Sequence, residues 1–157
     1  MDADRTRIDR ATRIVSAPRA AVWRLLVDPA RLARWLPPQG MRGGVDVWEP
    51  WPGGRFRLTL SYDEPDSGTA GKTTSDTDVV EGRFVELAAN ERMVWAVVFR
   101  SDDPAFAGEM RMSWRLRDVA GGTEVAIAAW DVPSGIGAED HAAGLASTLA
   151  NLARELA

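Results

Sequence analysis

The stretch AEDHAAGLASTLANLAREL, residues 138–156, decides the fold because it repeats with the period of a helix. Leu145, Thr148, Leu149 and Leu152 recur every three or four positions and therefore share one helical face. A helix of roughly 19 residues would be about 28 Å long, enough to cross a β-sheet. We therefore expect this helix to cover the apolar face of a sheet formed by the preceding residues.

The residues before this helix alternate between polar and apolar side chains, as half-buried strands do. The clearest run is 55–62, in which Phe56, Leu58, Leu60 and Tyr62 share one side. Glycine-rich and polar turns separate the runs, which favours antiparallel neighbours. We predict strands, in chain order, over residues 7–15, 45–48, 55–62, 79–87, 92–100, 109–117 and 123–130.

Two short helices are predicted between the first two strands. Ser16 followed by Pro18 is typical of a helix start, with the serine as cap and the proline in the first turn. Asp28 followed by Pro29 repeats that pattern, and Pro37-Pro38 ends the second helix. The predicted order is therefore one strand, two helices, six strands and one long helix.

The composition bounds the domain count and the chemistry. The chain has 157 residues and a formal net charge of −4, so we expect one domain over 1–157 with a flexible polar loop at about 63–78. The absence of cysteine excludes disulfides, thiol catalysis and cysteine-based metal centres. His141 is the single histidine, so a centre with several histidines is excluded as well. We expect no metal, no cofactor and no assigned catalytic residue.

The sequence also limits the expected partners and location. The acidic balance argues against a nucleic-acid partner. The longest apolar run, residues 93–99, is too short to cross a membrane. The charged start of the chain has no apolar signal region, so we expect a cytoplasmic protein.

Several strings in this order resemble the START-like, or SRPBCC, superfamily, and more narrowly the branch named after the activator of heat-shock-protein-90 ATPase. The matching strings are Ala17-Pro18 with Val22-Trp23, Asp28-Pro29 with Leu32-Ala33-Arg34-Trp35, Pro52-Gly53-Gly54-Arg55-Phe56, Gly82-Arg83-Phe84-Val85-Glu86-Leu87 and Gly122-Thr123-Glu124-Val125. A bacterial subset of the branch is similar at residues 101–108 and at Val132-Pro133, Gly135-Ile136, Asp140-His141 and Gly144. The resemblance covers nearly the whole chain.

The resemblance implies an α+β helix-grip fold, shared with the birch-pollen allergen, in which a curved antiparallel sheet wraps around a long C-terminal helix. It also implies a cavity between sheet and helix, which in this superfamily usually holds a hydrophobic or aromatic small molecule. Some members are cyclases or hydrolases. The branch is named after a co-chaperone with an additional N-terminal domain. Because the first predicted strand begins at residue 7, we do not expect the co-chaperone role here.

Alternation identifies the side chains that would line such a cavity. The predicted lining residues are Trp35, Phe56, Leu58, Leu60, Tyr62, Phe84, Trp95, Val97, Phe99, Met110, Met112, Trp114, Ile127, His141, Leu145 and Leu149. The same residues would also pack a solid core, since dense cores and apolar pockets have similar compositions. The leading hypothesis is a module that binds a hydrophobic small molecule.

Two other functions stay open at this point. An enzyme of the cyclase or hydrolase kind would need polar groups in the cavity, and the candidates are His141, Tyr62, Glu109 and Arg111, of which the last two should point outward. A protein-interaction role, or a homodimer, would need exposed aromatic side chains. Trp48 and Trp51, which flank a turn, are the candidates for that contact.

Overall fold

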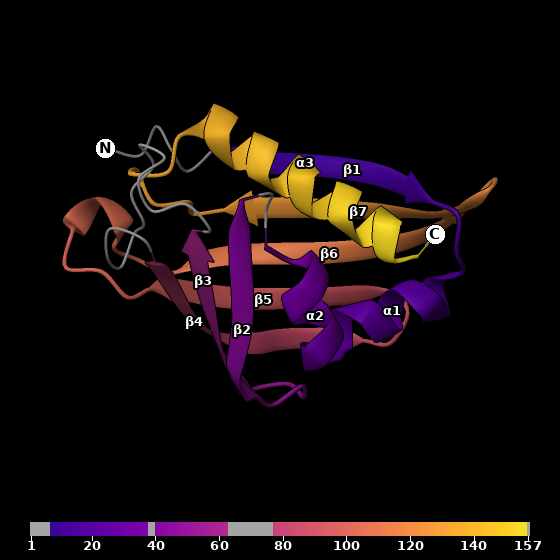
Figure 1. The fold of residues 1–157 in the computed structure, drawn as a ribbon, viewed down its shortest axis with the longest axis horizontal. Helices are drawn as coiled ribbons and strands as arrows, with labels where there is room; N and C mark the ends of the chain where they lie inside the picture. Colours follow the sequence, from indigo (N-terminus) through magenta and orange to yellow (C-terminus); the bar gives the residue numbers. More distant parts are fainter. Residues whose placement is uncertain (1–6, 38–39, 63–76, 157) are drawn as a thin grey trace.

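Figure 1 shows a computed structural model that describes residues 7–37, 40–62 and 77–156. Its strands form one antiparallel sheet in the order β1-β7-β6-β5-β4-β3-β2. The strands are β1 (Ile8–Val15), β2 (Met41–Trp48), β3 (Arg55–Tyr62), β4 (Thr77–Ala88), β5 (Arg92–Phe99), β6 (Met110–Val119) and β7 (Gly122–Trp130). The helices are α1 (Arg19–Val27), α2 (Pro29–Trp35) and α3 (Ala138–Glu155), with a short 3-10 helix η2 (Pro104–Phe106). The predicted element order and the helix-grip arrangement are confirmed.

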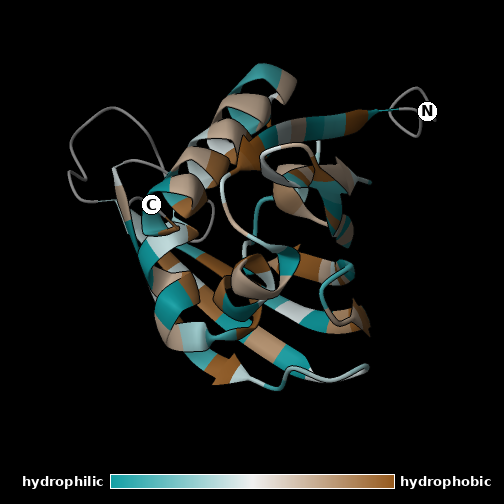
Figure 2. Ribbon diagram, turned by 90° about the vertical axis from the view of Figure 1, so that its right-hand side faces the viewer, coloured by the Kyte–Doolittle hydropathy of each residue, from teal (hydrophilic) through white to brown (hydrophobic). Residues whose placement is uncertain are grey.

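The alternation along the strands buries one face of the sheet. In β6, Met110, Met112, Trp114 and Leu116 are buried, whereas Arg115 between them is exposed. Figure 2 shows hydrophobic and hydrophilic residues alternating along the strands. Because successive side chains of a strand point to opposite faces, the buried set forms the inner face beneath the helices.

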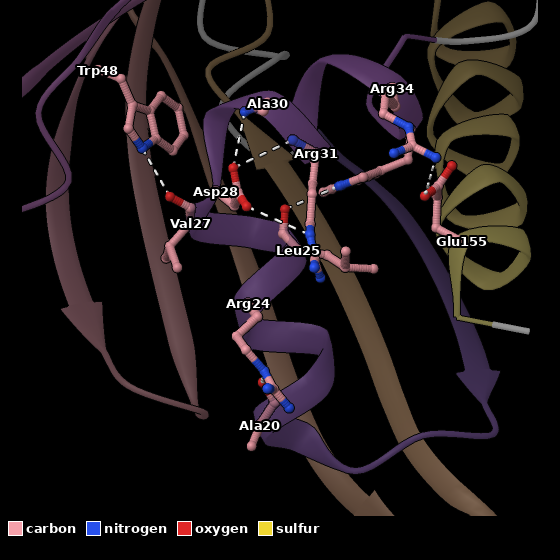
Figure 3. A network of polar contacts seen from close by, with 11 residues as sticks. Ala20, Arg24, Leu25, Val27, Asp28, Ala30, Arg31, Arg34, Trp48 and Glu155 are labelled. Atoms are coloured by element: carbon pink, nitrogen blue, oxygen red, sulfur yellow. Dashed lines mark hydrogen bonds and ion pairs between the residues drawn. The ribbon is translucent and has the colours of Figure 1, made fainter.

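The first turns of α1 and α2 begin differently. At α2, Asp28 is the cap, and its side chain accepts from the backbone N–H of Ala30 at 3.0 Å and of Arg31 at 3.5 Å, as predicted (Figure 3). At α1, the expected cap at Ser16 is wrong. Pro18 occupies the cap position with extended backbone angles, and no side chain bonds the first turn. Proline reaches those angles without strain, so α1 begins without the serine.

Helix α3 lies along β1 and also touches α2 (Figure 1). Leu145, Thr148, Leu149 and Leu152 are its buried residues, which confirms the predicted face. The Thr148 hydroxyl donates to the carbonyl oxygen of Leu36 at 2.9 Å. This bond ties α3 to the end of α2.

Several strand boundaries differ from the prediction, and the largest difference is at the start of β2. Strand β2 begins at Met41 and not at 45. The sequence did not indicate the earlier start, because Gly43 and Gly44 interrupt the apolar alternation. A Cβ on Gly43 would lie 2.6 Å from the Pro37 ring and 3.3 Å from the Ala33 carbonyl oxygen, so the close approach of α2 and the segment after it requires glycine. Strand β4 already includes residues 77–78, which we had placed in a flexible loop. The remainder of that loop, 63–76, lies outside the described residues.

Candidate ligand-binding interior

A chain of aromatic rings crosses the inner face of the sheet. The ring centroids of Trp48 and Phe84 lie 5.1 Å apart, and those of Phe56 and Trp95 lie 4.9 Å apart. The chain continues from Trp95 to Trp114 at 5.5 Å. Trp35 then meets Trp114 edge to face at 5.6 Å. Such tilted and edge-to-face pairs are the favoured aromatic geometries, so the centre of the interior is well packed.

Helix α1 provides hydrogen-bond acceptors for two of these indoles. The Trp35 Nε1–H donates to the carbonyl oxygen of Leu25 at 3.0 Å. The Trp48 Nε1–H donates to that of Val27 at 2.9 Å (Figure 3). Both carbonyls belong to the last turn of α1, where backbone oxygens lack partners within the helix. The sequence placed Trp48 at a turn as a surface candidate, but its ring packs on Phe84, and Trp51 is the exposed one.

The two central indoles have no such acceptor. Within the described part of the chain, the Nε1 atoms of Trp95 and Trp114 are buried and have no hydrogen-bond partner. The two residues are 2% and 0% exposed. Buried donors are rarely left unpaired in native proteins, because desolvating one without compensation costs about 1 to 3 kcal/mol. These two N–H groups are therefore the unusual polar feature of the interior.

The predicted lining residues fall into two groups by burial. The residues that are buried are Trp35, Phe56, Leu58, Phe84, Trp95, Val97, Met110, Met112, Trp114, Ile127, Leu145 and Leu149. The half-buried residues are Leu60, Tyr62, Phe99 and His141. The second group includes the ends of β3 and β5 and the first turn of α3. The structure thus separates a packed centre from a partly open end.

Tyr62 lies near a buried carboxylate at this end of the sheet. Asp78 of β4 is 2% exposed, and its strand position opposes Leu60, two residues before Tyr62. Burial, followed by the negative charge of Asp78, raises the pKa of the Tyr62 hydroxyl. The hydroxyl therefore stays protonated at neutral pH. Sequence reasoning missed Asp78 because the polar residues before it suggested a loop.

His141 belongs to a partly buried polar cluster at the start of α3. Its Nδ1 lies 2.7 Å from Oδ2 of Asp9, and the Arg7 guanidinium meets the same carboxylate at 2.8 Å. Arg7 also donates to the Ile136 carbonyl oxygen at 2.7 Å. Burial raises the pKa of Asp9, but the hydrogen bonds from Arg7 and His141 outweigh it, so the pKa is lowered overall. Asp9 lies on the inward side of β1 together with Val15, whereas Ile8 and Ile14 are exposed on the other side, so the hydrophobic pattern of this strand did not identify it.

Two of the strings that carried the family resemblance touch one another. The backbone N–H of Gly135 donates to the Ala105 carbonyl oxygen at 2.7 Å. A Cβ on Gly135 would lie 2.8 Å from the Phe106 ring, so the contact needs glycine at this position. The segments around 101–108 and 132–136 are therefore one structural unit at the end of the sheet.

The described residues enclose hollows of very different size, two of which bear on the site. One of about 10 Å³, the size of a single water, lies between α2 and strands β2 and β3. Another, of about 590 Å³, is open and lies on the outer face, where Arg92, Arg115 and Glu124 belong to its lining.

Neither a metal-binding cluster nor a membrane-spanning helix is found among the described residues. Among them, no group of three or more His, Cys, Asp or Glu side chains is arranged to hold a metal ion. Within the same ranges, no helix combines the length and the apolar character needed to span a membrane.

Comparisons with known proteins agree with this architecture. A protein called CV1439, from Chromobacterium violaceum, is 28% identical, with a TM-score of 0.83 over 95% of this chain and 96% of that chain. An AHSA1-like protein from Aeromonas hydrophila is 20% identical, with a TM-score of 0.68 over 94% and 90% of the two chains. DynU16, a putative protein in the dynemicin biosynthetic locus, is 22% identical, with a TM-score of 0.67 over 95% of this chain and 46% of that chain.

No curated protein sequence matches this chain. The family model described as "Activator of Hsp90 ATPase homolog 1-like protein" matches residues 16–157. That range includes every element of the structure except β1. The chain therefore belongs to the Activator of Hsp90 ATPase homolog 1-like family.

Proposed function

We propose that this protein binds a hydrophobic or aromatic small molecule between the inner face of the sheet and α3. The observation that supports it is a change of burial along single strands. On β3, Phe56 is buried, whereas Leu60 and Tyr62 on the same face are half-buried. On β5, Trp95 is buried and Phe99 is half-buried. The apolar inner face thus extends beyond the part that the helices cover, and it can bury a ligand there.

The route from this end to the centre is lined by adaptable side chains. Val97 lies between Phe99 and Trp95 on β5, and Met110 and Met112 lie beside it on β6. Methionine has three rotatable bonds and fills irregular spaces, so it can repack around a guest. The four residue steps along the strand from Phe99 to Trp95 span about 13 Å, which suits a molecule of two or three fused rings.

The driving force would be burial of apolar area, at roughly 25 cal/mol per Å². A ligand that binds only the folded state raises the melting temperature, and the rise continues with the logarithm of the ligand concentration above Kd. Neither the fold nor the family specifies one ligand, because related folds carry different functions.

A fluorescent, uncharged probe tests the proposal. N-phenyl-1-naphthylamine gains fluorescence when it leaves water, and its lack of charge avoids attraction to the arginines of the outer face. We expect saturable binding by the wild type and at least a tenfold loss in Phe99→Glu, since an unpaired carboxylate would have to be buried with the probe. Val98→Glu is the matched control, because Val98 is 40% exposed and faces outward on the same strand. Absence of binding, or equal loss in both variants, would contradict the proposal.

Catalysis in the same interior is the alternative. Of its candidate groups, Glu109 is paired with Arg83 at 3.2 Å and is exposed. His141 is paired with Asp9 at 2.7 Å, which orients its ring but also uses Nδ1. The geometry therefore supports binding better than acid–base chemistry.

A further inference from the structure

We infer that the bound molecule is neutral and carries a carbonyl-type oxygen, which accepts hydrogen bonds from the indole N–H groups of Trp95 and Trp114. This inference rests on the proposed function, because it identifies the chemical class of the ligand for that interior. It starts from two buried donors for which the described residues provide no acceptor.

The other two core indoles show that this fold can satisfy such donors. Trp35 and Trp48 reach the carbonyl oxygens of Leu25 and Val27 in the last turn of α1. Trp95 and Trp114 lie on adjacent strands in the middle of the sheet, and their N–H groups do not bond that turn. A phenylalanine in either place would fill most of the volume without the cost of an unpaired donor. The presence of indoles is explained if an acceptor arrives with a ligand.

One functional group can serve both donors. The ring centroids of Trp95 and Trp114 lie 5.5 Å apart, and the two strands are paired neighbours. A carbonyl oxygen has two lone pairs and accepts two hydrogen bonds. A single ketone, ester or amide oxygen therefore has enough acceptor sites for both N–H groups.

The surroundings of the two indoles favour a neutral group over a carboxylate. The described inner-face residues beside them are apolar, including Met93, Met112 and Phe84. The cations of β5 and β6, such as Arg92 and Arg115, belong to the outer hollow. A buried carboxylate without a cation would be strongly disfavoured, whereas a carbonyl needs only hydrogen bonds.

A pair of nearly isosteric probes tests the inference. 2-Acetylnaphthalene and 2-isopropenylnaphthalene differ in one place, where the ketone oxygen is replaced by CH₂. We expect the wild type to bind the ketone about tenfold or more tightly, because the alkene leaves both donors unpaired. Binding is measured by displacement of N-phenyl-1-naphthylamine. In the Trp95→Phe/Trp114→Phe double variant, the preference for the ketone should fall to about twofold or less.

The indole protons provide an independent readout. In ¹H–¹⁵N spectra, the Nε1–H signals of Trp95 and Trp114, assigned with the single Phe variants, should move downfield when the ketone is added and stay in place with the alkene. Trp51→Phe is the matched control, because Trp51 is 56% exposed and should leave the preference for the ketone unchanged.

The outcomes separate the two proposals. If neither naphthalene binds, the proposed function fails. If both bind equally well, the interior binds apolar molecules and the inferred carbonyl is wrong. Two further results would overturn the inference, because each would show that the donors already have partners. One is an internal water that stays bound to both indole N–H groups in the ketone complex. The other is an upfield shift of the Nε1–H signals, caused by neighbouring aromatic ring faces, that is the same before and after the ketone is added.

Discussion

The interior contains two regions with the same aromatic composition and different hydrogen bonding. Where α1 ends, Trp35 and Trp48 place their rings in the core and their N–H groups on helix carbonyls. At the middle of the sheet, Trp95 and Trp114 are also buried, yet their N–H groups have no partner in the described residues. Burial and ring geometry do not distinguish the regions, whereas the hydrogen bonds do.

This difference indicates which region is complete. A donor that is paired within the protein contributes to stability in the unliganded state. A buried donor that is unpaired reduces stability until an acceptor arrives. The first region is therefore structural, and the second is the part of the core where a ligand can add something that the protein lacks.

The largest expected effect comes from substituting one indole in each region and comparing the losses of stability. Trp35→Phe should destabilise the protein by about 3 kcal/mol, because it opens a cavity and leaves the Leu25 carbonyl without its donor. Trp114→Phe should cost about half as much, since the loss of volume is partly offset by removal of an unpaired donor. Urea unfolding followed by circular dichroism measures both. Equal losses would show that the two regions do not differ.

The second test asks whether a buried carboxylate with hydrogen-bond partners contributes to stability, as a buried indole with a partner does. Asp9→Asn should cost about 2.5 kcal/mol at pH 7, because Arg7 and His141 lose a carboxylate that is 4% exposed. The folded-state pKa of Asp9 is below its ordinary value of 3.8, so its contribution is present above that pH and lost as the pH falls through the lower value. As the pH falls below 4, the Asp9→Asn variant should therefore lose less stability than the wild type loses.

Exposed Asp131 provides the control for that test. It has a φ of +57°, which asparagine also tolerates, so Asp131→Asn should change stability by less than about 0.5 kcal/mol. A variant of Asp9 that loses stability equally at pH 3 and pH 7 would contradict the lowered pKa.

The third test concerns Phe56, whose ring contacts both Trp48 and Trp95 and so links the two regions. Gly82 lies beneath that ring, and a Cβ there would meet the ring and would lie 2.9 Å from the Ala96 carbonyl oxygen. Gly82→Ala should therefore destabilise by about 2 kcal/mol through overpacking. Gly44→Ala is the control, because a Cβ at Gly44 meets nothing within 4 Å. Equal effects of the two substitutions would show that the ring can move freely.

The smallest expected effect is at the cap that positions α2. Asp28→Ala should cost about 1 kcal/mol, because two backbone N–H groups lose their acceptor (Figure 3). Arg34→Ala removes only an ion pair with Glu155 at 3.4 Å, in which Arg34 is 69% exposed, and should cost less than about 0.5 kcal/mol. Thermal unfolding of both variants makes the comparison. A larger loss in Arg34→Ala would reverse the order that burial predicts.

Much of the fold followed from local pattern. The strand 55–62 and the helix near 138–156 were found at almost their observed bounds, because each has a strong period of two or of 3.6 residues. The predictions were wrong where local signals competed. Ser16 resembled a cap but precedes a proline that takes the position itself, and residues 77–78 resembled a loop because a polar run precedes them.

Less of the candidate site than of the fold could be predicted from the sequence. Alternation identified the inward residues, yet it could not separate the half-buried end from the packed centre. Asp9 and His141 are 132 positions apart, so no local pattern connects them. Asp78 was overlooked because the polar run before it suggested a loop, and its burial depends on how β3 and β4 pair.

By itself, the sequence determined which way each side chain faces, because the backbone repeats of helices and strands set side-chain direction residue by residue. Only the tertiary structure decided which buried polar groups find partners. Hydrogen bonds require particular atoms to meet within about 3 Å, and that depends on contacts between distant segments. Trp35 and Trp114 therefore look alike in the sequence, although only Trp35 has a partner for its N–H within the described residues.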